Sequence, residues 1–118
     1  MRKTLFAITA GALLLALSAQ GAQARTVSGT ELKKLRGVYT AIWKGRKARV
    51  KLNADGTLHA VSGTKKDVGR WRVRGNVLCV AFRVWTRGKY KCGTVEKKGA
   101  WYVGLRKKNG VPRLKFRR

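Results

Sequence analysis

Arginine and lysine are the main candidates for binding chemistry in this chain, because they number 29 against four acidic residues. They recur at every second position in five separate segments rather than in one basic block. Such side chains bind phosphates and carboxylates, and arginine binds them through paired hydrogen bonds. We therefore expect a binding site for an anionic polymer. Its candidate residues are Arg49, Lys51, Arg70, Arg72, Arg74, Arg87, Lys89, Lys91, Arg106, Lys108, Arg113, Lys115 and Arg117.

Three aromatic residues lie close to these bases in the sequence, namely Trp43, Trp85 and Tyr90. An exposed ring beside a basic residue can stack on nucleic-acid bases or on sugars. The sequence contains no RNA-recognition, helix-turn-helix or zinc-finger motif. We therefore expect binding through charge and stacking, without readout of a base sequence.

The sequence offers little for catalysis. Glu31, Asp55, Asp67 and Glu96 are its only acids, and we expect them in a helix cap, a turn and two loops. His59, the only histidine, has no evident nucleophile and orienting partner. Two cysteines and one histidine are too few for a zinc site of the usual kind. We predict a protein that is not an enzyme and has no catalytic residue, metal or cofactor.

The spacing of the bases also predicts the elements that carry them, because a period of two is typical of strands with one wet and one buried face. Turn residues such as Asp55-Gly56 separate eight short segments. Ser28, with Glu31 three residues later, predicts the start of a helix over 28–37. The expected strands are 38–44, 47–52, 57–61, 69–74, 77–85, 90–95, 101–106 and 113–116.

This element order predicts a mainly β fold, a small antiparallel meander that closes into a barrel or half-barrel with one short N-terminal helix. A two-sheet sandwich is the alternative. The expected core consists of Val38, Ile42, Val50, Leu52, Leu58, Trp71, Val73, Leu78, Val80, Phe82, Trp101, Val103, Leu105, Leu114 and Phe116.

The first 24 residues have the pattern of a cleaved Sec-type signal peptide. Arg2 and Lys3 precede an apolar run over 5–17, and Ala22-Gln23-Ala24 matches a small-x-small cleavage site. A retained membrane anchor is the alternative, but the run is shorter than the roughly 20 residues of a spanning helix. We expect a single β-rich domain at 25–118, periplasmic or secreted by a bacterium, with no membrane span after cleavage.

The chain has two cysteines, Cys79 and Cys92. In an exported protein such a pair is expected to form a disulfide, and closing this loop stabilises the fold by about 3 kcal/mol in the chain-entropy model. Two free buried thiols are the alternative.

A series of short motifs runs through the same region. Gly37-x-Tyr39 is followed by Asn53-x-Asp55-Gly56-Thr57, Gly69-x-Trp71-x-Val73, Leu78-Cys79 and a second cysteine at Cys92. In this order the motifs resemble an uncharacterised family of small exported proteobacterial proteins, over about residues 28–103. The resemblance implies a periplasmic β-rich domain with a structural disulfide and no established enzyme activity.

Three functions are compatible with this sequence. The first is an exported, non-enzymatic protein whose cationic sheet binds nucleic acid, lipopolysaccharide, acidic polysaccharide or an anionic envelope surface. The second is an inhibitor or accessory subunit for an acidic protein partner. The third is a lipocalin-like carrier of a small ligand, which needs unfilled space inside the barrel. A surface that only solubilises normally mixes both charge signs, so we favour the first.

Overall fold

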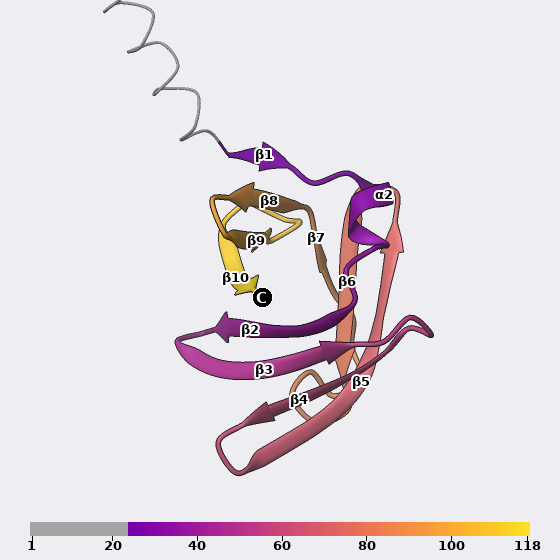
Figure 1. The fold of residues 1–118 in the computed structure, drawn as a ribbon, viewed down its shortest axis with the longest axis vertical. Coiled ribbons are helices and arrows are strands. Elements are labelled where there is room, and N and C mark those ends of the chain that lie inside the picture. Colours follow the sequence, from indigo (N-terminus) through magenta and orange to yellow (C-terminus); the bar gives the residue numbers. More distant parts are fainter. Residues whose placement is uncertain (1–23) are drawn as a thin grey trace, which may run out of the picture.

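The protein folds into one curled antiparallel sheet with a single short helix, in a computed structural model that describes residues 24–118 (Figure 1). All of the expected signal peptide except Ala24 lies outside the described residues. The mainly β class, the short N-terminal helix and the half-barrel form predicted from the sequence are confirmed.

Ten strands and one helix make up the described chain. They are β1 (Arg25–Thr26), α2 (Gly29–Leu32), β2 (Gly37–Trp43), β3 (Arg46–Leu52), β4 (Thr57–Ser62), β5 (Lys65–Arg74), β6 (Val77–Phe82), β7 (Lys91–Gly93), β8 (Val95–Lys98), β9 (Trp101–Leu105) and β10 (Pro112–Arg117).

The order of the strands curls the sheet around an interior. Strands β2 to β7 form a meander, β10 pairs with β2, and the full order is β1-β8-β9-β10-β2-β3-β4-β5-β6-β7. Only Thr94 separates β7 from β8, although these strands lie near opposite ends of that order. The backbone N–H of Leu105 donates to the carbonyl of Thr94 at 2.9 Å. The chain itself therefore joins the two ends of the sheet.

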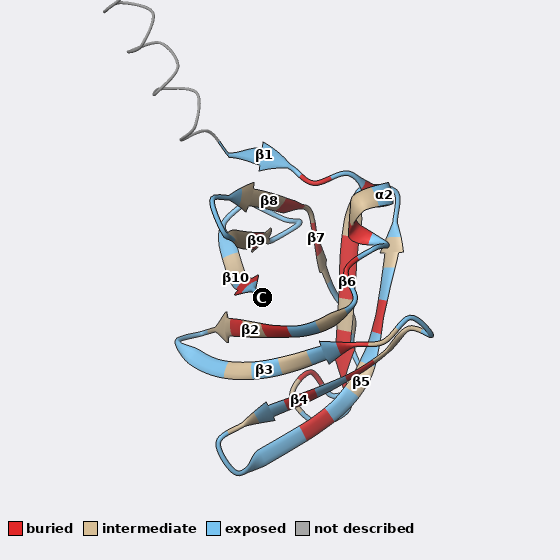
Figure 2. Ribbon diagram, viewed as in Figure 1, coloured by how far each residue is buried: buried red, intermediate tan, exposed pale blue. Residues whose placement is uncertain are grey.

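The core fills the inside of this curl (Figure 2). Leu58, Trp71 and Phe82 from three neighbouring strands are buried, as the sequence predicts. At one end, Val27 and Leu32 around α2 are fully buried. The short helix thus closes one end of the interior.

The side chains of β2 that face the interior are not the ones expected from the sequence. Val38 is 42% exposed and Ile42 is only half-buried, whereas Tyr39 and Ala41 are buried. The register explains this, because Tyr39 lies opposite the inward-facing Val50. The Tyr39 ring also packs edge-on against Phe116, with centroids 5.5 Å apart.

Several predicted boundaries are wrong. The strand expected over 77–85 ends at Phe82, because the buried Thr86 hydroxyl accepts from the Phe82 N–H at 2.8 Å and turns the chain. The strand expected over 90–95 is divided between β7 and β8 at Thr94, where the chain changes pairing partner. The helix expected over 28–37 has only four residues.

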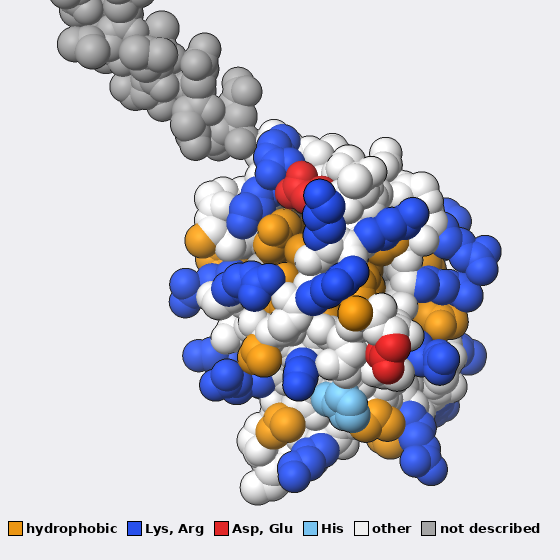
Figure 3. Space-filling view, turned by 45° about the vertical axis from the view of Figure 1, so that its right-hand side comes forward, with side chains coloured by type: hydrophobic (Ala, Val, Ile, Leu, Met, Phe, Trp, Pro, Cys, Tyr) orange, Lys and Arg blue, Asp and Glu red, His pale blue; other side chains and the backbone are white. Residues whose placement is uncertain are grey.

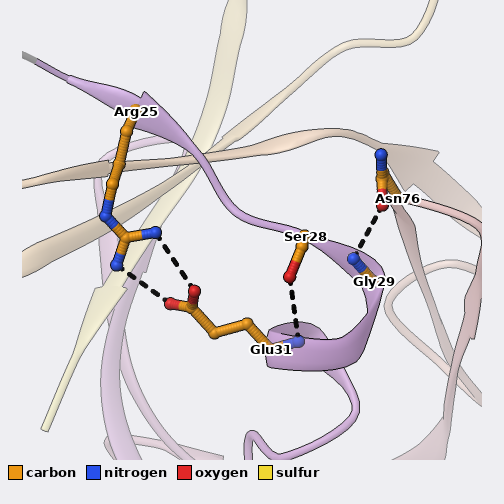
Figure 4. A network of polar contacts seen from close by, with 5 residues as sticks. All are labelled: Arg25, Ser28, Gly29, Glu31 and Asn76. Carbon is orange, nitrogen blue, oxygen red and sulfur yellow. Dashed lines mark hydrogen bonds and ion pairs between the residues drawn. The ribbon is translucent and has the colours of Figure 1, made fainter.

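The predicted helix start is confirmed at Ser28, whose side chain accepts from the backbone N–H of Glu31 at 3.2 Å (Figure 4). The Glu31 carboxylate does not complete a capping box. It accepts two hydrogen bonds from the guanidinium of Arg25 instead, both 3.1 Å long. This contact ties β1 to the helix.

Candidate polyanion-binding face

Seven of the predicted anion-binding residues lie on the outer face of the sheet. Directly paired residues of an antiparallel sheet share a face. Each of these seven residues either alternates with buried core residues along its own strand or is paired with a residue that lies next to a core residue on the neighbouring strand. All seven are exposed. They are Arg49 and Lys51 on β3, Arg70, Arg72 and Arg74 on β5, and Lys115 and Arg117 on β10.

The strand register makes part of this set continuous. Arg117 on β10 lies opposite Thr40, which in turn lies opposite Arg49 on β3. One step along, Lys115 and Lys47 flank Ile42 in the same way. The sequence prediction omitted Lys47, which extends the row. We call the outward bases of β3, β5 and β10 the outer cationic face.

This face has almost no internal charge compensation. Among residues 24–118, ion pairs form between Arg25 and Glu31 at 3.1 Å and between Lys98 and Glu96 at 4.0 Å, neither on β3, β5 or β10. Lys and Arg side chains are spread over the surface in Figure 3, and acidic side chains cover only small areas of it. The bases are free to contact an external anion.

A shallow depression on the same face offers a concave contact surface. It encloses about 590 Å³ of open space, and its lining includes His59, Arg70, Arg83 and Tyr90. The guanidinium of Arg72 lies 3.9 Å from the centre of the Tyr90 ring, a cation–π contact that orients both side chains. Arg83 was missed because it follows β6 in a loop and breaks the alternating pattern.

Six predicted bases lie elsewhere. Arg87, Lys89, Arg106 and Lys108 are in loops and exposed. Lys91 lies opposite the core-facing Val80, and together with Arg113 it lines a separate space beside Trp43 and Leu114. The alternating spacing thus does not bring all thirteen residues to one face.

The aromatic residues are also divided between the two faces. Trp43 and Trp85 line the interior, so they are turned away from the outer cationic face. Trp101, expected in the core, is only half-buried and lies on the outer side. The Lys115 ammonium and the Arg117 guanidinium lie 4.7 and 5.0 Å from its ring centre. Trp101 therefore lies among the outer bases, as Tyr90 does beside Arg72.

The acidic residues have structural partners. Asp55 occupies the turn between β3 and β4, where its carboxylate accepts from the Thr57 hydroxyl at 2.6 Å and backbone N–H at 3.0 Å. Both hydrogen bonds lower the pKa of Asp55 from its ordinary value, and the bond from the Thr57 hydroxyl has the larger effect. Asp67, expected as a loop charge, is instead a buried strand residue, 5% exposed. Its carboxylate accepts from the backbone N–H groups of Val84 and Trp85.

The predicted disulfide is confirmed. Cys79 on β6 and Cys92 on β7 are directly paired across the sheet, with Cα atoms 4.1 Å apart. The bond closes the loop that carries Trp85 and Tyr90.

Comparison of the chain with protein-family models, with curated proteins and with solved structures found no match in any of the three. The family resemblance of the motif series stays a prediction. The helix found within residues 24–118 is too short to cross a membrane.

Proposed function

We propose that this protein is an exported, non-enzymatic binder of polyanions, which it contacts with the outer cationic face. The observation that carries the proposal is the absence of ion pairs at the bases of β3, β5 and β10 among residues 24–118. Surfaces built for solubility intersperse both signs, so this imbalance supports a role in anion binding.

The sheet supports a linear polymer better than a compact ligand. Successive outward residues on a strand are about 6.6–6.8 Å apart, so Arg70, Arg72 and Arg74 present a row of guanidinium groups along β5. Arginine matches the oxygens of phosphate or carboxylate through two parallel hydrogen bonds. Binding to such a row releases the counterions of the polymer, which supplies most of the free energy of non-specific association.

Trp101 adds a sequence-tolerant contact. Its ring lies among Lys115 and Arg117, where the base or sugar of a bound polymer can stack on it. The depression at Arg70 and Tyr90 supplies a second such place on β5.

A salt titration tests the proposal. Heparin, double-stranded DNA and lipopolysaccharide are each titrated at 50 and 200 mM salt, and we expect Kd to rise steeply for the preferred polymer, by about 10³-fold if six phosphates are contacted. A flat salt dependence, or no binding near physiological salt, would disprove polyanion binding. A stoichiometric complex with an acidic protein that survives high salt would favour the accessory-subunit alternative instead.

Variants locate the binding face. The triple variant Arg70→Gln, Arg72→Gln, Arg74→Gln should weaken binding and flatten its salt dependence, with an unchanged circular dichroism spectrum. The matched control replaces three loop bases, Arg106→Gln, Lys107→Gln and Lys108→Gln, and removes the same charge. Equal weakening by both triples would show that net charge alone drives binding.

A further inference from the structure

The end of the interior opposite α2 is open. Its rim is formed where the β2–β3 and β4–β5 hairpins meet the loop after β6. The rim encloses about 420 Å³ of open space, and its lining includes Trp43, Trp85, Lys44, Arg46, Ser62 and Lys65. The opening therefore combines two indole rings with three bases.

An apolar cavity lies directly behind this rim. It has a volume of about 70 Å³, and Trp43, Arg46, Ala48 and Trp85 line both spaces. Its deeper walls are aliphatic and aromatic side chains such as Val50. Because a cavity of roughly 150 Å³ holds benzene, this one has room for only a few carbon atoms. A longer apolar group would extend outward between the two indoles.

Strand register determines which bases face the interior at the rim. Arg46 lies opposite Trp43 and Lys65 lies opposite Ser62, so both bases share the inner face. Their neighbours Lys47 and Lys66 are on the outer face. Neither Arg46 nor Lys65 forms an ion pair with an acid of residues 24–118. The rim therefore carries positive charge without acidic ion-pair partners among the described residues, at the edge of an apolar space.

The indole Nε1 of Trp43 is buried, and no acceptor lies within hydrogen-bond distance among residues 24–118. A buried N–H without a partner is destabilising, and the Trp43 side chain that carries it lines both the rim and the cavity.

We propose that this open end binds a small amphiphilic anion. A carboxylate or phosphate headgroup contacts Arg46 and Lys65, while the hydrocarbon chain lies between Trp43 and Trp85 and its end enters the apolar cavity. The rim is preorganised for this ligand, because Asp67 fixes the backbone of Trp85. The site faces inward and does not depend on polymer binding at the outer face.

The test uses protein with ¹⁵N-labelled tryptophan and decanoate below its critical micelle concentration. We expect saturable binding of one decanoate per chain, with a shift of the Trp43 indole N–H resonance on ligand addition. Acetate at the same ionic strength should leave that resonance in place. Non-saturating binding, or a Trp43 resonance that does not move, would overturn the proposal.

Two double variants with the same loss of charge separate the inner site from the outer face. Arg46→Gln with Lys65→Gln should weaken decanoate binding about tenfold or more, since two charged contacts are lost. Lys47→Gln with Lys66→Gln, each one residue further along the same strand, should change it less than about twofold. Equal effects would overturn the proposal. Heparin binding by these variants reports on the outer face separately, so failure of one proposal does not imply failure of the other.

Decyl phosphate and decanol identify the headgroup. Tighter binding of decyl phosphate than of decanoate would assign the site to a phosphate-bearing lipid, and the reverse to a free carboxylate; either result supports an anion site. Binding of uncharged decanol as tight as that of decanoate would overturn it. Ala48→Leu, which fills the shared wall of rim and cavity, should weaken decanoate binding with all charges retained.

Discussion

Asp67 and Trp85 are joined by a hydrogen bond of 2.8 Å from the backbone N–H of Trp85 to the buried Asp67 carboxylate. The same carboxylate accepts from the N–H groups of Val84, at 3.1 Å, and Val68, at 2.8 Å. A buried acid in a chain with so few acids is thus used to hold a loop. That loop carries one of the two indoles at the open end of the interior.

Replacing Asp67 should therefore be strongly destabilising. In Asp67→Ala three backbone donors lose their acceptor at a partly buried place, and we expect a loss of about 2–4 kcal/mol in the free energy of unfolding. Urea denaturation measures it. The control Glu96→Gln removes one negative charge at a partly exposed position of β8, and should change stability by less than about 1 kcal/mol. Similar losses in both variants would mean that net charge, not the hydrogen bonds, is responsible.

The disulfide should contribute measurably to stability. Reduction of Cys79–Cys92 frees a loop with a sequence separation of 13, and we expect a loss of about 3 kcal/mol. For a domain of this size such a loss lowers the Tm by more than about 10 °C. Thermal melts with and without a reductant measure the difference, and the double variant Cys79→Ala, Cys92→Ala should melt at the same temperature in both. Mass spectrometry that finds two free thiols in the exported protein would contradict the bond itself.

The period of the sequence predicts which residues share a face, but not which face is wet. On β5 the charged side chains identify the solvent-exposed face, because Arg70 and Arg72 alternate with Trp71. Strand β2 carries apolar residues on both faces, so its orientation depended on pairing with β3 and β10 and could not be predicted locally. The face on which Lys91 lies could not be predicted locally either. Lys91 follows the same alternation but lies opposite the core-facing Val80.

The open end itself could not be predicted, because no contiguous motif encodes it. Trp43, Lys65 and Trp85 come from three separate segments, and only the curl of the sheet brings them together. The Asp55-Gly56 turn and the Ser28 cap, in contrast, depend on residues within one turn of chain. Their predictions are confirmed by the hydrogen bonds at Thr57 and Glu31.

The contact between α2 and the β5–β6 turn should be intolerant of any side chain at Gly29. A Cβ at this position would lie 1.9 Å from the carbonyl oxygen of Gly75, and the Gly29 N–H donates to Asn76 Oδ1 at 2.7 Å (Figure 4). Gly29→Ala must push the helix off the turn, and we expect a loss of about 2 kcal/mol or more in denaturant unfolding. Thr30→Ala, at the exposed next residue of the same helix, should be tolerated. A Gly29→Ala protein as stable as Thr30→Ala would show that α2 does not pack closely there.

The ion pair between Arg25 and Glu31 should give the fold a pH-dependent component. Hydrogen bonding from the Arg25 guanidinium lowers the pKa of Glu31 from its ordinary value of 4.5. A carboxyl with a lowered pKa in the folded state stabilises the fold above its ordinary pKa, and this contribution is lost as pH falls through the lowered value. The native protein should thus have a higher Tm than Glu31→Gln at pH 6, and the difference in Tm should disappear as the pH falls well below 4.5. Arg25→Gln, which removes the other partner, should behave as Glu31→Gln does at pH 6. A difference between native protein and Glu31→Gln that persists unchanged at low pH would contradict an electrostatic origin.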